Sequence, residues 1–185
     1  MNANNFRLMN WTDSMEAGAC LRLNRITRHR GLKLYFTAIS RLGNGVLWYS
    51  ILAAIPLLGG VNLIPLTLHI GSTALIGVAI YKFCKLTLVR ERPFVTHEQI
   101  VCIGTPLDRG SFPSGHTIHA TSFTIMLGTL YPPALWVLVP VAGSIAISRI
   151  VLGHHYPSDV LAGAVIGTYL GATSLSLLPA TMFQT

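Results

Sequence analysis

The chain has 185 residues, of which 51% are hydrophobic and only 10% are charged, and its mean hydropathy is +0.57. Soluble domains carry about 25% charged residues, so this composition excludes an ordinary soluble domain and indicates a membrane protein. The net charge of +7 comes mostly from the first 41 positions and from residues beside apolar stretches. This distribution favours anionic lipid over nucleic acid as the partner.

Two features are expected to be absent. Cys20, Cys84 and Cys102 are odd in number and follow no metal-ligand spacing, so neither a disulfide framework nor a zinc site is expected. The N-terminal region contains Asp13 and Glu16 and no continuous apolar stretch, so we expect no cleavable signal peptide. Membrane insertion would then depend on apolar stretches further along the chain.

The first predicted elements lie in residues 17–41. This stretch mixes leucine, isoleucine and phenylalanine with arginine and lysine, which is typical of amphipathic helices in the headgroup layer of a bilayer. We predict one or two interfacial helices here; the alternative is a solvated basic tail. A single domain, residues 1–185, would thus comprise a basic N-terminal segment, residues 1–41, and a transmembrane bundle, residues 42–178.

Five apolar stretches follow, and a helix of about 20 residues is needed to cross a bilayer. They cover residues 42–60, 63–84, 117–131, 134–150 and 160–178. Glycines after the first stretch and a Pro-Pro pair after the third predict two tight antiparallel hairpins. The predicted fold class is all-α, an integral membrane bundle of about five transmembrane helices, with six as the alternative.

The 13 lysine and arginine residues all fall on one face of this five-span arrangement. Seven precede the first stretch, five lie in or near the loop after the second, and Arg149 ends the fourth. Cytoplasmic loops are enriched in lysine and arginine, so this rule alone makes the basic face cytoplasmic.

The loop after the second apolar stretch carries the first motif. Lys85 and Arg92 are separated by six residues, and Pro93 follows. Basic residues near a helix end often only extend to the interface, so the motif is weak by itself. Asp108 and Arg109 lie further along the same loop and are candidates for shaping the entrance of a site.

A second motif, Pro113-Ser114-Gly115-His116, leads into the third apolar stretch. Ser114 is a predicted helix N-cap, and the amides of residues 114–116 could cradle an anion at the positive end of the helix dipole. A plain capping turn is the alternative, but the histidine favours a functional site.

The third motif joins the fourth and fifth stretches and contains Ser148, Arg149, His154, His155 and Asp159. His155 and Asp159 are four residues apart, so the carboxylate could orient one ring nitrogen and leave the other free to attack. His154 is the competing nucleophile but lacks this spacing to an acid. A simple capping pair is the alternative interpretation.

Taken together, the three motifs resemble the type 2 phosphatidic acid phosphatase (PAP2) superfamily, with the signature K-x6-R-P, P-S-G-H and S-R-x5-H-x3-D. The matching residues are Lys85, Arg92, Pro93, Pro113, Ser114, Gly115, His116, Ser148, Arg149, His155 and Asp159. The resemblance covers about residues 42–178. The departure is at the N-terminus, where many members have a further span that is not found here.

The resemblance implies how the phosphate would be held. Lys85, Arg92 and Arg149 would clamp its oxygens. The Ser114 hydroxyl and the Gly115 amide would add donors directed at charge that develops in the transition state.

The resemblance also implies the catalytic roles. His155 would attack phosphorus and form a phosphohistidine, and Asp159 would fix the tautomer of its ring. His116 would protonate the departing oxygen and later accept a proton from water. No metal or other cofactor is expected, because three cations already neutralise the phosphate.

The expected substrate is a phosphomonoester or pyrophosphate of a membrane lipid, of the phosphatidic acid, phosphatidylglycerol phosphate, polyprenyl or lipid A type. Alternatives are a phosphotransferase that uses the same intermediate and a non-enzymatic lipid-binding or transport protein. The expected location is a bacterial inner membrane with the site at the interface. The charge rule favours the cytoplasmic side, whereas bacterial relatives that act on envelope lipids commonly work on the periplasmic side.

Overall fold

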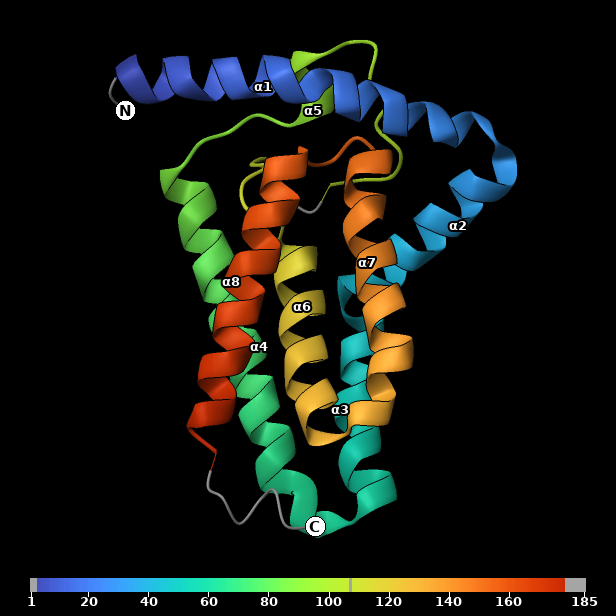
Figure 1. The fold of residues 1–185 in the computed structure, drawn as a ribbon, viewed down its shortest axis with the longest axis vertical. Coiled ribbons are helices and arrows are strands. Elements are labelled where there is room, and N and C mark those ends of the chain that lie inside the picture. The colour runs from blue at the N-terminus through green and yellow to red at the C-terminus, as the bar shows by residue number, and fades with distance from the viewer. Residues whose placement is uncertain (1–2, 107, 179–185) are drawn as a thin grey trace.

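The structure is a computed structural model that describes residues 3–106 and 108–178. Within these residues the chain forms helices and loops and no strands, which confirms the predicted all-α class. Five helices run side by side as a bundle (Figure 1). They are α3 (Leu47–Gly59), α4 (Ile64–Thr87), α6 (Gly115–Leu130), α7 (Leu135–Val151) and α8 (Pro157–Ser176). Each coincides with one of the five apolar stretches.

Among the described helices, three segments are long and apolar enough to cross a membrane. They are Arg30–Gly59, Val61–Thr87 and Pro132–Val151. The number of spans therefore stays a prediction, as does the side of the membrane that the basic face occupies.

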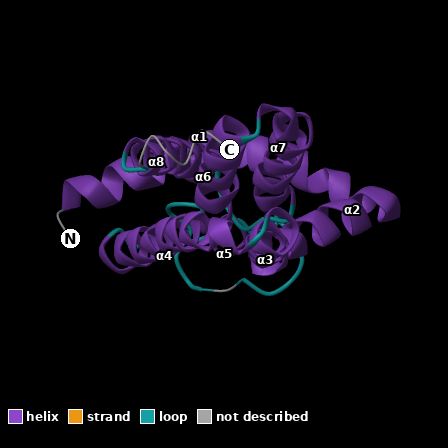
Figure 2. Cartoon of the chain, turned by 90° about the horizontal axis from the view of Figure 1, so that it is seen from below, coloured by secondary structure: helices purple, strands orange, loops and turns teal. Residues whose placement is uncertain are grey.

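Both predicted hairpins are present. Short 3-10 turns at η3 (Val61–Leu63) and η4 (Pro132–Ala134) join α3 to α4 and α6 to α7. Seen along the bundle, α7 and α8 flank α6, and α3 and α4 lie on its other side (Figure 2). The core includes Trp48 of α3, which stacks on Phe123 of α6 at a centroid distance of 4.6 Å.

The closest helix contact joins α6 and α8. Gly163, Gly167 and Gly171 recur every four residues on the face of α8 that meets α6. A β-carbon at Gly163 would lie 2.7 Å from the carbonyl oxygen of Ser114, and one at Gly167 would collide with the carbonyl of Ile118. Small residues at this spacing let two helix backbones approach closely. The beginnings of α6 and α8, which carry the second and third motifs, are thereby held together.

The N-terminal region differs from the prediction in its boundaries. Helix α1 (Ala3–Asn24) begins upstream of residue 17 and lies across one end of the bundle, and α2 (Arg30–Arg41) returns obliquely toward the bundle beside α7 (Figure 1). Helix α2 does not stop at residue 42. It continues through η2 (Leu42–Val46), a π-helical segment, into α3.

The kink between α2 and α3 is at Gly45. Its φ of +127° lies outside the helical region, in a range that glycine tolerates and other residues avoid, so the regular helix is interrupted there. The predicted interfacial position of residues 17–41 stays a prediction.

Helix α1 is fastened to the bundle through Asn24. Its side-chain amide donates to the carbonyls of Val101 and Val151 at 2.9 Å, and its carbonyl oxygen accepts from the Val101 amide at 2.9 Å. The short helix α5 (Pro93–Thr96) lies between α1 and the bundle (Figure 1). The end of the bundle that carries all three motifs is therefore covered by α1.

We expect Gly167→Ala to lower the free energy of unfolding by about 1–3 kcal/mol, the usual cost of overpacking a tight contact. The added methyl group has no room against the α6 backbone. Thermal unfolding in detergent measures the change. The matched control is Gly143→Ala on α7, where a β-carbon meets nothing within 4 Å and where alanine should be neutral or stabilising. Equal stability of the two variants would contradict this account of the α6–α8 contact.

Candidate active site

A cavity of about 730 Å³ lies where the three motifs converge. It is lined by six of the eight predicted site residues: Lys85, Arg92, Gly115, His116, Arg149 and His155. The other two, Ser114 and Asp159, are fully buried. Residues from the ends of α4, α6 and α7 and from two loops thus meet at one place.

The two cations of the first motif share one carboxylate. Lys85 Nζ lies 2.7 and 2.9 Å from the two oxygens of Asp108, and Arg92 Nη2 lies 2.9 Å from Asp108 Oδ1. Arg92 also donates through Nη1 to the carbonyl of His154 at 2.9 Å. Asp108 was expected only to shape the entrance, but it pairs with both predicted phosphate ligands.

Arg149, at the end of α7, supplies the third cation. Its side chain is 4% exposed, and Nη1 donates to the hydroxyl of Ser40 on α2. Its Nε is buried and makes no hydrogen bond within the described residues. A buried guanidinium with an unused donor at a cavity wall suits an anionic ligand.

The third motif places His155 beside Asp159 as its spacing predicts. His155 Nδ1 lies 3.5 Å from Asp159 Oδ2, which is a contact rather than a formed hydrogen bond. Asp159 Oδ2 also accepts a hydrogen bond from the backbone amide of Tyr156, at 2.8 Å. His155 lines the cavity, whereas His154 lies outside that lining, which supports His155 over its neighbour.

Both histidines of this loop are kept neutral by their surroundings. Burial, reinforced by the nearby charges of Arg149 and Arg92, lowers the pKa of His155 well below its usual range. The same causes lower the pKa of His154 to about 3. A neutral imidazole has a free lone pair, so His155 is in the form that a nucleophile requires at neutral pH.

Ser114 stands at the N-cap of α6 as predicted, but its hydroxyl does not cap the helix. It accepts a hydrogen bond from Thr117 at 2.9 Å. The Ser114 amide donates to the carbonyl of Asp159 at 3.0 Å, which ties the beginning of α6 directly to the beginning of α8. The expected contribution of the Ser114 hydroxyl to anion binding stays a prediction.

Sequence reasoning missed a partner of His116. His116 Nε2 lies 2.5 Å from Oδ1 of Asn44, which belongs to the π-helical segment η2. Both residues line the cavity. The Gly-Asn-Gly sequence in an apolar stretch was the available signal.

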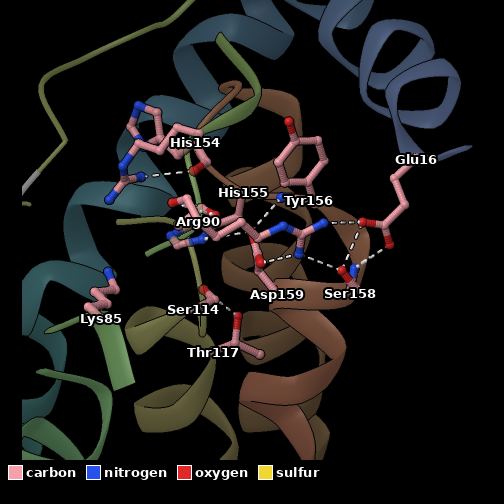
Figure 3. A network of polar contacts seen from close by, with 12 residues as sticks. Glu16, Lys85, Arg90, Ser114, Thr117, His154, His155, Tyr156, Ser158 and Asp159 are labelled. Atoms are coloured by element: carbon pink, nitrogen blue, oxygen red, sulfur yellow. Dashed lines mark hydrogen bonds and ion pairs between the residues drawn. The ribbon is translucent and has the colours of Figure 1, made fainter. Parts of the chain in front are cut away.

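Arg90 was also missed, although it lies two residues before Arg92. Figure 3 shows its guanidinium between Asp159, Ser158 and Glu16. Asp13 completes the set of partners. The available signal was that Asp13 and Glu16 are the only acidic residues in the first 41 positions.

The cavity wall away from these polar groups is apolar. Tyr49 on α3 and Leu68 and Leu75 on α4 line it, yet their side chains are also 72%, 67% and 71% exposed. The cavity therefore opens sideways between α3 and α4, on a surface where bilayer tails would lie if these helices cross a membrane. It offers an apolar chain a path to the charged end.

Comparisons with known proteins agree with the motifs. The model of the PAP2 superfamily matches residues 65–182. The undecaprenyl-diphosphatase BcrC of Bacillus subtilis is 36% identical over 121 residues, which are 65% of this chain and 62% of the relative. The decaprenylphosphoryl-5-phosphoribose phosphatase of Mycolicibacterium smegmatis is 42% identical over 98 residues, 52% of this chain and 51% of the relative. The matches thus span less than two thirds of either relative.

Two solved structures are similar along most of the chain. LpxE of Aquifex aeolicus has a TM-score of 0.68 at 29% identity, covering 84% of this chain and 92% of that one. A transmembrane PAP2-type phosphatidylglycerolphosphate phosphatase from Bacillus subtilis has a TM-score of 0.64 at 19% identity, covering 94% and 93%. The second likeness bears on the fold alone.

We expect Asp108→Asn to bind inorganic phosphate about tenfold more tightly than the unaltered protein. The Asp108 carboxylate occupies the donors of Lys85 and Arg92, and an anion must compete with it for them. A tenfold change in the dissociation constant corresponds to about 1.4 kcal/mol of binding free energy. This is a modest part of the strength of the charge-assisted hydrogen bonds between Asp108 and the two cations. Isothermal titration calorimetry of the purified protein measures the affinity.

Glu98 is exposed, and Glu98→Gln is the matched control for the loss of one acidic charge. The affinity of this variant for phosphate should stay within about twofold of that of the unaltered protein. Weaker phosphate binding by Asp108→Asn would mean that Asp108 holds the two cations in place instead of competing for them.

Proposed function

The chain belongs to the PAP2 superfamily, and we propose that it is a membrane phosphatase that removes phosphate from a lipid through a phosphohistidine on His155. The observation that carries this proposal is the composition of the cavity. One wall holds three cations together with His116 and His155, and the other is apolar and open toward the side of the bundle. Such a cavity suits a molecule with an anionic head and a long apolar tail.

Phosphate binding would be the task of Lys85, Arg92 and Arg149. Each faces the cavity from a different element, so the three could contact different oxygens of one phosphate. Cations in a largely buried site stabilise anionic charge more strongly than they would in water. Burial, reinforced by the charges of these three cations, lowers the pKa of His155, so the same buried arrangement would serve binding and nucleophile activation.

The chemical step would begin with attack of the free His155 ring nitrogen on phosphorus, with the P–O bond to the lipid breaking on the opposite side. Asp159 faces the other ring nitrogen and would stabilise the imidazolium that forms. His116 would deliver a proton to the departing lipid oxygen. Water would then attack the phosphohistidine and pass a proton to His116, which releases inorganic phosphate and restores both histidines.

The substrate class proposed first is a polyprenyl phosphate or diphosphate. The names of the two relatives reported above are undecaprenyl-diphosphatase and decaprenylphosphoryl-5-phosphoribose phosphatase, and both refer to a polyprenyl group. The apolar path between α3 and α4 suits a single long chain. Phosphate release from a panel of undecaprenyl diphosphate, phosphatidic acid and phosphatidylglycerol phosphate, with the protein in detergent, tests this choice. Adding an acceptor alcohol separates hydrolysis from phosphotransfer.

We expect His155→Ala to abolish turnover and His116→Ala to reduce it by about 10²- to 10⁴-fold, the usual contribution of general acid–base help. The residual activity of His116→Ala should be greatest with p-nitrophenyl phosphate, whose leaving group needs no proton. Steady-state phosphate release in EDTA measures both, and EDTA itself should not reduce the activity of the unaltered protein.

His29 is exposed, and His29→Ala is the control for the loss of a histidine. This variant should retain full activity. Acid-labile phosphate trapped by rapid quenching should map to His155 by mass spectrometry. Label on His154, or equal modest losses in the His155 and His116 variants, would refute the assignment of roles.

A further inference from the structure

We propose that Arg90 and helix α1 are a positioning part of the active site: Arg90 orients the Asp159 carboxylate toward His155, and Asp13 and Glu16 of α1 hold Arg90. This inference rests on the proposed roles of His155 and Asp159. It goes beyond them because Arg90 is no member of the signature and α1 lies outside the residues that the family model matches.

Two arginines of the same loop face different groups. Residues 89–92 have no helical structure, and because residues i and i+2 of a regular extended segment would point to the same side, the backbone must turn between Arg90 and Arg92. Arg92 reaches the cavity and Asp108. Arg90 points the other way, toward α1 and the beginning of α8 (Figure 3). Glu91, between them, is exposed.

All donors of the Arg90 guanidinium are used. Nε and Nη2 donate to Asp13 Oδ1 at 2.9 and 2.6 Å, and Nη2 also donates to Glu16 Oε2 at 2.9 Å. Nη1 donates to Ser158 Oγ at 2.7 Å and to Asp159 Oδ1 at 2.5 Å. The group also lies over the ring of Tyr156, 4.2 Å from its centroid. Five N–H groups in a rigid plane fix the position of every partner.

This contact determines how the Asp159 carboxylate is turned. Oδ1 is held by Arg90, and Oδ2 accepts from the Tyr156 amide and faces His155 Nδ1. Asp159 is fully buried and Arg90 is 5% exposed, so water cannot replace Arg90 as the partner of Oδ1. Without it, the carboxylate would lose its charged anchor and keep only the Tyr156 amide and the Ser111 side chain.

The acids of α1 have an electrostatic task in addition. A lone guanidinium beside Asp159 would offset the negative charge that stabilises a developing imidazolium on His155. Asp13 and Glu16 balance Arg90 from its far side, which leaves the Asp159 charge available to the histidine. Glu16 also accepts from the Ser158 amide and hydroxyl, both at 2.8 Å, so α1 holds the first turn of α8 directly.

Arg90 is absent from the lining of the 730 Å³ cavity, whereas Lys85, Arg92 and Arg149 are part of it. It lines a second cavity of about 680 Å³ that shares Lys85, Arg92 and Asp108 with the first, so its role has to be separated from phosphate binding by experiment. A phosphate-binding arginine would affect the substrate affinity. A positioning arginine would affect the chemical step, and this difference makes the two roles separable by kinetics.

The first test is Arg90→Lys, which keeps the charge but cannot bridge Asp13, Glu16 and Asp159 at once. We expect kcat to fall about 10²-fold, as for a small misplacement of a catalytic group, with KM unchanged within about threefold. The rate of phosphohistidine formation in rapid-quench experiments should fall by the same factor. Glu91→Gln, at the exposed position next to Arg90, is the matched control and should match the unaltered protein.

A second variant, Asp13→Asn combined with Glu16→Gln, keeps the shapes of both side chains and removes their charge. We expect kcat to fall about tenfold with KM unchanged, because Arg90 then loses its balancing charge. This variant decides the question if Arg90→Lys does not fold, which thermal unfolding in detergent reports.

The outcomes are distinguishable. Unchanged kcat in folded Arg90→Lys, or in the α1 variant, overturns the inference, and so does a raised KM at unchanged kcat, which would make Arg90 a phosphate ligand. Absence of phosphohistidine on His155 in the unaltered protein would instead overturn the proposed function itself.

Discussion

Positive charge buried at one end of the bundle is the constraint on which the rest of the structure depends. Arg90, Arg92 and Arg149 are each at most 5% exposed, and removing an unpaired charge from water costs several kcal/mol. Arg90 and Arg92 are therefore met by carboxylates from elsewhere in the chain, whereas Arg149 contacts one hydroxyl and keeps an unused donor within the described residues. Asp13 and Glu16 come from α1, Asp108 and a carbonyl come from the two loops, and Ser40 comes from α2. These needs account for a helix lying across the end of the bundle and for loops folded inward.

The second constraint is steric and acts between α6 and α8. Glycines at every fourth position of α8 let the two backbones touch, and the Ser114 amide bonds to the Asp159 carbonyl where both helices begin. The second and third motifs are thus fixed relative to each other by main-chain contacts, which side-chain rotation cannot loosen. The proposed acid and nucleophile, His116 and His155, consequently line the same cavity.

The cavity joins two environments that rarely meet in one site. Its charged end is enclosed by motif residues, and its apolar wall reaches side chains exposed on α3 and α4. A lipid phosphate has the same division along its length. The π-helical segment that carries Asn44 lies at the junction, where it contacts His116. Under the proposed function, the fold would place the reacting end of an amphipathic ligand at a fixed depth.

The sequence by itself determined the helix positions, the two hairpins and the family, because apolar length and the spacing of three motifs are local properties of the chain. It also predicted that His155 lies beside Asp159, and the contact forms because the chain turns at Pro157 and the Asp159 carboxylate, in the first turn of α8, points back toward the loop. It did not determine the contact of Asn44 with His116 or the partners of Arg90. Those contacts join residues at least 68 positions apart. Only the packing of helices decided them, because no local spacing encodes which buried charge will face which acceptor across the bundle.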